Sequence, residues 1–446
     1  MMRSFTGPNH RKSGQSAGTA ILAVSLVSLF CILLFHLISG TPAAETGNAA
    51  GGSSGSSAEG YSFLGQNYEP FDIFRMENAD FTAVVLSDLH FSSGRPLITS
   101  DTAPQQSRIE AITHTFLAET AAIRPDVLIL CGDNTDIGDQ PSMEQLCALL
   151  SETEASGIPV VLCPGNHDYG ISSAEDYRRC FEPLFHADTC DSTTLSYSRR
   201  IGNCRLFSLD DNYEGNGIYG SFPDATLKWL DAGLDAAAAA GEMPIVITHH
   251  NLFRGTVPEH EENYVIQNPE LTELLKKHRV KLVFSGHRHG QEIIHPEPDA
   301  PYEIISGFPS SYPFYFGVLK ITGGSIRYQA QSIDFAAYGA EYGTQDLSSA
   351  NAELPDSQSV FAGAIDSMLE GQALSRKDKE AVRSLFLRFT DLTLRAEIAE
   401  HKEEILKDPM YHKMMMALKD SNYARWIQYV MEHAELPGYH LELDAE

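Results

Sequence analysis

The sequence is short of positive charge. It contains 32 Lys and Arg residues against 60 Asp and Glu residues, a formal net charge of -28. Proteins that bind nucleic-acid polymers or anionic lipids do so through a basic surface that neutralises the phosphates. We therefore expect no nucleic-acid polymer among the partners of this chain, and we draw no expectation about protein partners.

Cysteine is also scarce, with seven residues, and none of them is spaced as C-x-x-C. The spacing therefore does not indicate a structural zinc site. Cys131 and Cys163 each end an apolar run, where a small buried side chain is the favoured interpretation. Cys180 and Cys190 bracket an expected loop and could form a disulfide outside the cytoplasm, although we favour two free thiols.

A long hydrophobic run occurs at the N-terminus, over residues 20–39. Its core of roughly 19 apolar residues can cross a bilayer as a helix and exceeds the hydrophobic region of a signal peptide, roughly 7–15 residues. Basic residues precede the run, and the next one after it is Arg75. The length of the run predicts a retained transmembrane signal anchor, and the charge asymmetry predicts that its N-terminus is cytoplasmic. The rest of the chain is then membrane-anchored and extracytoplasmic, or secreted if the segment is cleaved.

Composition divides the chain into five parts. We expect a basic cytoplasmic segment at 1–19, a transmembrane signal anchor at 20–39, a flexible Gly/Ser/Ala linker at 40–70, an α/β domain at 71–345 and a helical domain at 346–446. The linker includes a Gly-Gly-Ser-Ser-Gly-Ser-Ser run that cannot bury enough apolar surface to order itself. In the last part, Ser375 resembles a helix cap, and apolar residues follow it at helical spacing.

The middle of the chain contains short apolar runs that each end in polar residues. Residues 81–86 precede Asp88 and His90, 126–131 precede Asp133 and Asp136, 158–163 precede Asn166, His167 and Asp168, 204–209 precede Asp210 and Asp211, 244–248 precede His249 and His250, and 280–285 precede His287 and His289. Helical spacing over 107–123 and 143–151 predicts β-α-β units with parallel strands. Their carboxyl ends meet at one edge, where open α/β sheets place their sites. One such cluster has an ordinary structural explanation, but several together indicate a functional site.

These motifs resemble the signature of a known family. D-x-H, G-D-x-x-D, G-N-H-D, an isolated His after a strand and G-H-x-H occur in the order typical of calcineurin-like metallophosphoesterases, over about residues 81 to 334. The resemblance implies a four-layer α/β/β/α sandwich that binds two divalent metal ions. The helical tail is similar in architecture to that of bacterial cyclic-nucleotide phosphodiesterase-like members of the family.

The resemblance also implies a role for each site residue. The first metal would be bound by Asp88, His90, Asp133 and His289, with Asp133 bridging to a second metal bound by Asn166, His249 and His287. We choose His249 over His250 because the family usually ligates with the first His of such a pair, so His250 would lie near the substrate. Substrate contacts are expected from Asn166, His167 and His250.

The role of His167 follows from the same resemblance, and the expectations for its neighbours follow from the residues themselves. His167 would be a general acid or would stabilise the transition state, and Asp168 would orient its imidazole ring. Asp136 is expected to stabilise its loop, and Arg288 to point away from the metals. The aromatic residues from Phe308 to Tyr315 are expected to pack in the core or at the rim of the site.

The donor types indicate the metal and the reaction. Imidazole, carboxylate and amide ligands suit Mn²⁺, Fe or Zn²⁺ better than Ca²⁺, which prefers oxygen ligands alone. Two ions about 3.5–4 Å apart can activate a bridging hydroxide for in-line attack on phosphorus. With the resemblance, these donors lead us to expect a bimetallic phosphoric ester hydrolase. The similarity of the helical tail implies that it acts on a phosphodiester, with a cyclic nucleotide as one candidate. The alternatives are a phosphomonoesterase or nucleotidase and, in a different class, a non-catalytic metal-binding surface module.

Overall fold

The computed structural model describes residues 79–98, 103–212, 217, 219–256, 265–348 and 356–444. The expected cytoplasmic segment, membrane anchor and linker lie outside these residues. Among the described residues, no helix combines the length and the hydropathy that crossing a bilayer requires.

The first sheet has six strands in the order β13-β12-β11-β1-β2-β3. Its strands are β1 (Phe81–Leu86), β2 (Val127–Cys131), β3 (Val160–Cys163), β11 (Tyr315–Thr322), β12 (Ser325–Ser332) and β13 (His440–Asp444). Strands β1, β2 and β3 are parallel. They are connected through α2 (Ile109–Ile123) and α3 (Gln140–Ala155), as the β-α-β pattern predicts. The loops that leave these three strands therefore start from the same edge of the sheet.

The second sheet has seven strands in the order β4-β5-β6-β7-β8-β10-β9. Its strands are β4 (Thr189–Cys190), β5 (Tyr197–Ile201), β6 (Cys204–Ser208), β7 (Met243–Ile247), β8 (Leu282–Ser285), β9 (Glu292–Ile294) and β10 (Tyr302–Ile305). Strands β6, β7, β8 and β10 are parallel. Helix α5 (Asp224–Ala240) lies between β6 and β7 in the sequence, and α6 (Pro269–Lys277) lies between β7 and β8.

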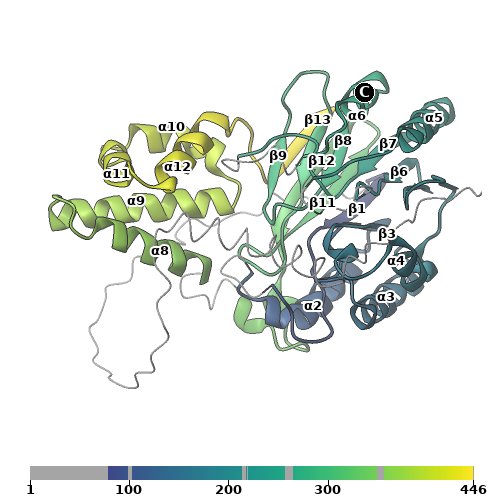
Figure 1. The fold of residues 1–446 in the computed structure, drawn as a ribbon, viewed down its shortest axis with the longest axis horizontal. Coiled ribbons are helices and arrows are strands. Elements are labelled where there is room, and N and C mark those ends of the chain that lie inside the picture. Colours follow the sequence, from purple (N-terminus) through teal and green to yellow (C-terminus); the bar gives the residue numbers. More distant parts are fainter. Residues whose placement is uncertain are drawn as a thin grey trace, which may run out of the picture.

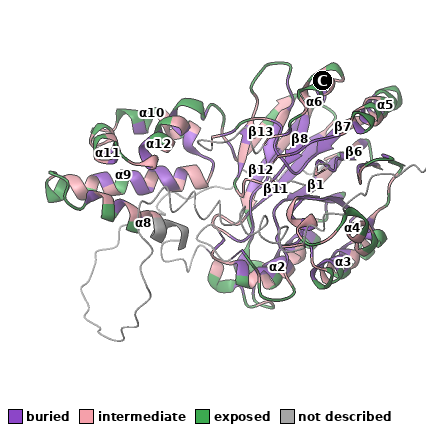
Figure 2. Cartoon of the chain, viewed as in Figure 1, coloured by how far each residue is buried: buried purple, intermediate pink, exposed green. Residues whose placement is uncertain are grey.

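The two sheets pack face to face with helices on both outer sides (Figure 1). Neighbouring residues of β1 pack in two different hydrophobic cores. Val85 packs between the sheets, and Val84 packs under α2 and α3. On the second sheet, Val246 packs against Leu234 of α5 and Leu271 of α6. Figure 2 shows the sheets buried and the outer helix faces exposed. The α/β fold with two sheets is thus the fold that the sequence predicts.

The C-terminal region contains five helices and one strand among the described residues. The helices are α8 (Asp356–Leu369), α9 (Arg376–Leu394), α10 (Ile398–Lys407), α11 (Tyr411–Leu418) and α12 (Asn422–His433), which share a core of their own. The chain then returns to the first sheet as β13, which pairs antiparallel with β12. The expectation of a helical C-terminal domain did not include β13, although His440–Asp444 alternates polar and apolar residues with the period of a strand.

Short helices complete the described structure. Helix α4 (Ala174–Cys180) follows the third motif loop, and α7 (Phe335–Tyr338) follows β12. Cys180 and Cys190, the pair considered for a disulfide from the sequence, are both free thiols.

Candidate metal centre

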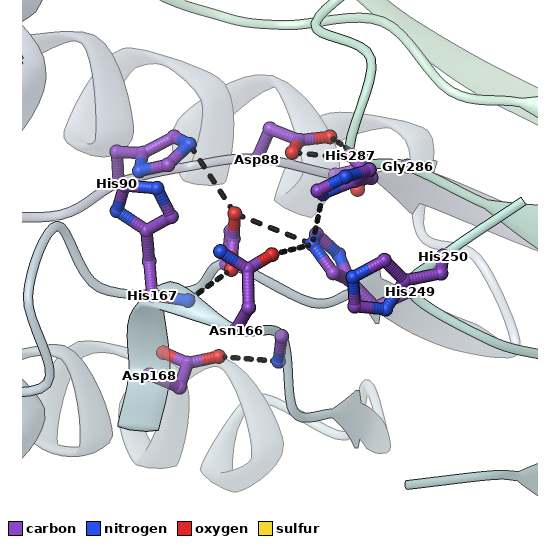
Figure 3. Close-up of polar contacts among 12 residues, drawn as sticks. Asp88, His90, Asn166, His167, Asp168, His249, His250, Gly286 and His287 are labelled. Carbon is purple, nitrogen blue, oxygen red and sulfur yellow. Dashed lines mark hydrogen bonds and ion pairs between the residues drawn. The ribbon is translucent and has the colours of Figure 1, made fainter. Parts of the chain in front are cut away.

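The motif loops from both sheets converge on one site. Asp88 and His90 follow β1, Asp133 follows β2, and Asn166 and His167 follow β3. His249 follows β7, and His287 and His289 follow β8. Figure 3 shows the side chains of Asp88, His90, Asn166, His249 and His287 directed toward a common centre. The packing of the two sheets therefore brings together residues that lie up to about two hundred positions apart.

The first group of donors consists of Asp88, His90, Asp133 and His289, whose ligand atoms all lie within 4.8 Å of one another. Nε2 of His90 lies 2.9 Å from Nε2 of His289 and 3.7 Å from Oδ2 of Asp133. Nε2 of His289 lies 3.5 Å from Oδ1 of Asp88. Two imidazole nitrogens and two carboxylates facing one point are a donor set for a transition-metal ion.

The second group shares Asp133 with the first and adds His249 and His287. Nε2 of His249 lies 3.3 Å from Oδ2 of Asp133, 3.1 Å from Oδ1 of Asn166 and 3.3 Å from Nδ1 of His287. Asp133 is the residue common to both groups. This geometry fits two adjacent ions bridged by one carboxylate, the arrangement predicted from the sequence, although the assignment of each ligand stays a prediction.

Burial and crowding perturb the ionisation of these residues. Burial raises the pKa of Asp88 to about 7, and the carboxylate of Asp133 adds to this effect. Burial alone would lower the pKa of His249, but the carboxylates of Asp133 and Asp88 outweigh it and raise the pKa to about 10. Burial lowers the pKa of His289 to about 4. Bound cations would hold the carboxylates ionised and the imidazoles neutral, so the donor set fits metal ions.

The backbone of the candidate ligands adopts an uncommon conformation. Asp88 (φ 53°), His90 (φ 46°), Asp133 (φ 48°), His287 (φ 69°) and His289 (φ 53°) all have left-handed φ values. Non-glycine residues rarely do so, and such residues cluster at functional sites. Main-chain hydrogen bonds between the loops hold two of them, from Asp88 to Gly132 (3.0 Å) and from His90 to Asp133 (2.8 Å).

Gly132 allows the close approach of two loops. A Cβ atom at this position would lie 2.4 Å from Nδ1 of His249, and its φ of +94° is one that L residues rarely adopt. Nδ1 of His249 lies 3.0 Å from the carbonyl oxygen of Cys131, which directs Nε2 toward Asp133 and Asn166. Gly132 of the G-D-x-x-D motif therefore has to be glycine, because any side chain there would collide with the ring of His249.

His167 lies beside the first group. Its main-chain N–H donates to Oδ1 of Asp133 at 2.7 Å, and its ring stands edge-on to that of His90, with the centroids 4.6 Å apart. Nδ1 lies 2.7 Å from the carbonyl oxygen of Asp136. Because Nδ1 donates to this carbonyl, Nε2 is left for another group. The position fits the predicted contact with a substrate.

The expectation that Asp168 orients the ring of His167 is wrong. The buried carboxylate of Asp168 accepts hydrogen bonds from Gly165 N (2.9 Å), Asn134 N (3.1 Å), Asn134 Nδ2 (2.9 Å), Thr135 N (2.8 Å) and Thr135 Oγ1 (2.8 Å). In Figure 3 its dashed line runs to the loop and not to the imidazole. A short 3-10 turn, His167–Tyr169, directs the two neighbouring side chains apart. Asp168 therefore ties together the second and third motif loops, and Asp136 holds His167.

His250 is buried behind the second group rather than open to solvent. Its Nδ1 lies 2.9 Å from Oδ1 of Asp211, and its ring centroid is 4.3 Å from that of His287. The other carboxylate oxygen of Asp211 accepts the main-chain N–H groups of His249 (3.0 Å) and His250 (2.8 Å). Asp211, at the strand tip noted in the sequence, thus supports a candidate ligand from behind. The predicted substrate contact of His250 stays a prediction.

Two further side chains border the centre. The ring of Phe308 stacks on that of His289, with centroids 4.3 Å apart and planes 16° apart. Phe308 is buried, as expected for packing at the rim of the site. Nη1 of Arg288 lies 3.7 Å from Oε2 of Glu292, which directs the guanidinium toward that carboxylate. The sequence named Phe308 among the aromatic residues of the core or rim, but it gave no sign that this ring stacks on His289.

Comparison with known proteins assigns one part of the chain to a family. The sequence model of the calcineurin-like phosphoesterase family matches residues 81–291. These residues form a calcineurin-like phosphoesterase domain. The family predicted from the motifs is therefore confirmed for these residues. The match begins with β1 and ends just before β9, so it includes the G-H-x-H motif.

Two curated proteins are similar to part of this chain. A probable cyclic nucleotide phosphodiesterase from Rhodococcus erythropolis is 26% identical over 211 residues, which are 46% of this chain and 64% of that protein. Purple acid phosphatase 23 from Arabidopsis thaliana is 25% identical over 146 residues, which are 32% of this chain and 30% of that protein. The chain therefore spans less than two thirds of the length of either relative.

Solved structures show a more distant likeness. A dimetal phosphatase from Danio rerio has a TM-score of 0.44 and 12% identity, over 57% of this chain and 97% of that chain. A purple acid phosphatase from yellow lupin seeds has a TM-score of 0.40 and 13% identity, over 56% of this chain and 51% of that chain.

Proposed function

We propose that the protein is a metal-dependent phosphodiesterase with two adjacent metal ions. The observation that carries this proposal is the position of Asp133, whose carboxylate belongs both to the group of Asp88, His90 and His289 and to the group of His249 and His287. A carboxylate between two sets of donors is what a pair of ions sharing one ligand requires.

Each side chain has a definite task in this proposal. Asp88, His90, Asp133 and His289 would hold the first ion, and Asp133, Asn166, His249 and His287 the second. The donors suit Mn²⁺, Fe or Zn²⁺. When bound, the two ions supply an activated water as nucleophile and neutralise the phosphate oxygens.

His167 would act on the substrate rather than on the metals. Its Nδ1–H is held by the carbonyl oxygen of Asp136, so the neutral ring presents a bare Nε2. When protonated, the same ring presents an Nε2–H toward the space beside His90. That proton can stabilise a phosphate oxygen in the transition state or pass to the leaving oxygen.

A diester substrate is favoured over a monoester. The preference for a diester is supported by the similarity, at 26% identity, to a protein described as a probable cyclic nucleotide phosphodiesterase. A phosphomonoesterase or nucleotidase is the second candidate, and the similarity to purple acid phosphatase 23 favours it. A non-catalytic surface module has less support, because such a module would have no need of both donor groups together with His167.

The membrane anchor forms part of the same proposal. We infer from residues 20–39 and the linker at 40–70 that the phosphoesterase domain is tethered to a membrane and faces out of the cytoplasm. A fractionation of cells that express the full chain, with and without protease added from outside, tests this arrangement. Protease-sensitive protein in the membrane fraction supports the proposal, and soluble protein inside the cell contradicts it.

The enzyme proposal is tested by measuring metal and hydrolysis together. The purified full-length protein is dialysed against Mn²⁺, and metal content and hydrolysis of bis(p-nitrophenyl) phosphate are measured on the same sample. We expect about two ions per chain and turnover that EDTA abolishes. Asp366→Ala is a matched control, because this carboxylate pairs with Arg383 in the C-terminal helices and belongs to no group of candidate metal donors. Absence of both metal and hydrolysis would contradict the proposal.

A further inference from the structure

Gln291 connects the G-H-x-H motif to two distant parts of the chain. It lies two residues after His289, and only 7% of the residue is exposed. Its Oε1 accepts a hydrogen bond from the hydroxyl of Tyr328 at 3.1 Å, and its Nε2 donates to the carbonyl oxygen of Gly438 at 2.8 Å. Both ends of a buried amide are thus satisfied, which makes this position specific for glutamine.

The Gly438 end of this network leads into the C-terminal helices. The N–H of Gly438 donates to the carbonyl oxygen of Ala396, just after α9, at 2.8 Å. A Cβ atom at Gly438 would lie 2.8 Å from Cβ of Ala396 and 3.4 Å from Cα of Glu292. The next residue, Tyr439, accepts from Ala330 of β12 at 2.7 Å. In Figure 1 this segment is where the chain passes from α12 back to the sheets at β13.

The Tyr328 end leads to the strand that carries the motif. The ring of Tyr328 is buried between the sheets, with its centroid 6.0 Å from that of Phe284 in β8. The chain runs from β8 directly into His287 and His289, which both have left-handed φ values. A loop in this uncommon conformation depends on neighbouring contacts to keep it there.

We infer that Gln291 is a positioning residue of the metal centre and that the C-terminal segment acts on the centre through it. Tyr328 and Gly438 hold the amide from two sides and fix the end of the loop that presents His287 and His289. The C-terminal region is then a structural part of the metal site rather than an attached independent domain. The inference rests on the proposed metal centre but not on the choice of a diester substrate.

The test measures metal affinity in the full-length protein. Gln291→Leu keeps a similar volume and removes both hydrogen bonds. We expect its affinity for Mn²⁺ to fall about tenfold, the lower end of the range for residues that support metal ligands. The control Arg327→Ala removes the ion pair of Arg327 with Glu442 on the same two strands, β12 and β13, and leaves Gln291 intact. We expect Mn²⁺ affinity in this control to equal that of the wild type.

A second variant keeps the test decisive if Gln291→Leu does not fold. Tyr328→Phe removes one of the two hydrogen bonds, and we expect a smaller loss of Mn²⁺ affinity, about threefold. The double variant should lose no more than Gln291→Leu alone, because both changes remove the same contact. Unchanged affinity in either single variant, or additive losses in the double variant, would overturn the inference. If the wild type bound Mn²⁺ but hydrolysed no ester, the proposed function would fail while this inference stood.

Discussion

Nδ1 of His167 lies 2.7 Å from the main-chain carbonyl oxygen of Asp136. A main-chain carbonyl cannot change its charge, so it fixes the ring and its tautomer without depending on pH. Nε2 of His90 lies 2.9 Å from Nε2 of His289, and His90 also forms a further group of possible metal donors with Asp136 and His167. The held Nδ1 of His167 supports the proposal that this histidine meets the substrate while His90 and His289 bind metal.

Replacing His167 should separate catalysis from metal binding. We expect His167→Ala to lower turnover by about 10²- to 10⁴-fold, the usual contribution of general acid catalysis, while the bound metal per chain is unchanged. His186→Ala is the control, because this histidine pairs with Glu154 outside the centre. Turnover measured beside metal content decides the matter, and loss of metal from His167→Ala would refute the division of roles.

Removing a metal ligand should lower both turnover and metal content. We expect Asn166→Ala and His289→Ala each to abolish measurable turnover and to reduce the metal content from about two ions to about one. The amide of Asn166 belongs with His249, at 3.1 Å, and His289 with His90, so each variant should empty a different position. Metal analysis after dialysis checks this. Two retained ions in either variant would show that the assignment of that ligand is incorrect.

Asp168→Ala should destabilise the fold. The carboxylate accepts five hydrogen bonds from the loops after β2 and β3. An unpaired buried donor costs about 1–3 kcal/mol, so we expect the free energy of unfolding to fall by about 3 kcal/mol or more. Urea unfolding in EDTA measures this loss, with the exposed Asp224→Ala as control. Unchanged stability with reduced turnover would instead restore the role first predicted for Asp168.

Glu119 should make stability depend on pH. Burial raises its pKa from 4.5 to about 7 in the folded protein. Between these values the unfolded chain ionises while the folded protein stays protonated, so stability falls as pH rises from about 4.5 to 7. We expect Glu119→Gln to be more stable than the wild type at pH 8 by about 3 kcal/mol, and equally stable at pH 4.

The pH experiment on Glu119 is controlled by the choice of Gln as the replacement and by a second variant, Glu152→Gln. Gln can still accept the hydrogen bond that Asp334 N donates to Glu119 at 2.8 Å, so the substitution removes only the ionisation. Glu152→Gln, at an exposed position of α3, should leave the pH dependence of unfolding in EDTA unaltered. Parallel pH profiles of the wild type and Glu119→Gln would show that the buried carboxyl is not responsible.

The sequence predicted the elements that local signals define. Apolar runs ending in polar residues located β1, β2, β3, β7 and β8, because parallel strands place their site residues at their carboxyl ends. The same logic brought Asp88, Asp133 and His289 to one place, as the structure has them. The order of strands and helices in the β-α-β pattern was enough to predict that these distant residues meet at one edge of the sheet.

Side-chain direction within a turn was not predictable. Asp168 follows His167 in the sequence, but the 3-10 turn sends its carboxylate to the loop of Asn134, and the partner of His167 is a main-chain carbonyl. Main-chain partners leave no trace in residue type. Gln291 escaped notice for a related reason, since its partners Tyr328 and Gly438 become neighbours only when β13 joins the sheet.

The most direct test of the proposed function compares two esters on one Mn²⁺-loaded preparation of the full-length protein. Initial rates on bis(p-nitrophenyl) phosphate and on p-nitrophenyl phosphate are measured at matched concentrations, with Asn166→Ala as the background. The proposal predicts a higher kcat/KM for the diester, abolished in Asn166→Ala. A higher kcat/KM for the monoester would contradict it, as would rates on both esters equal to those of Asn166→Ala.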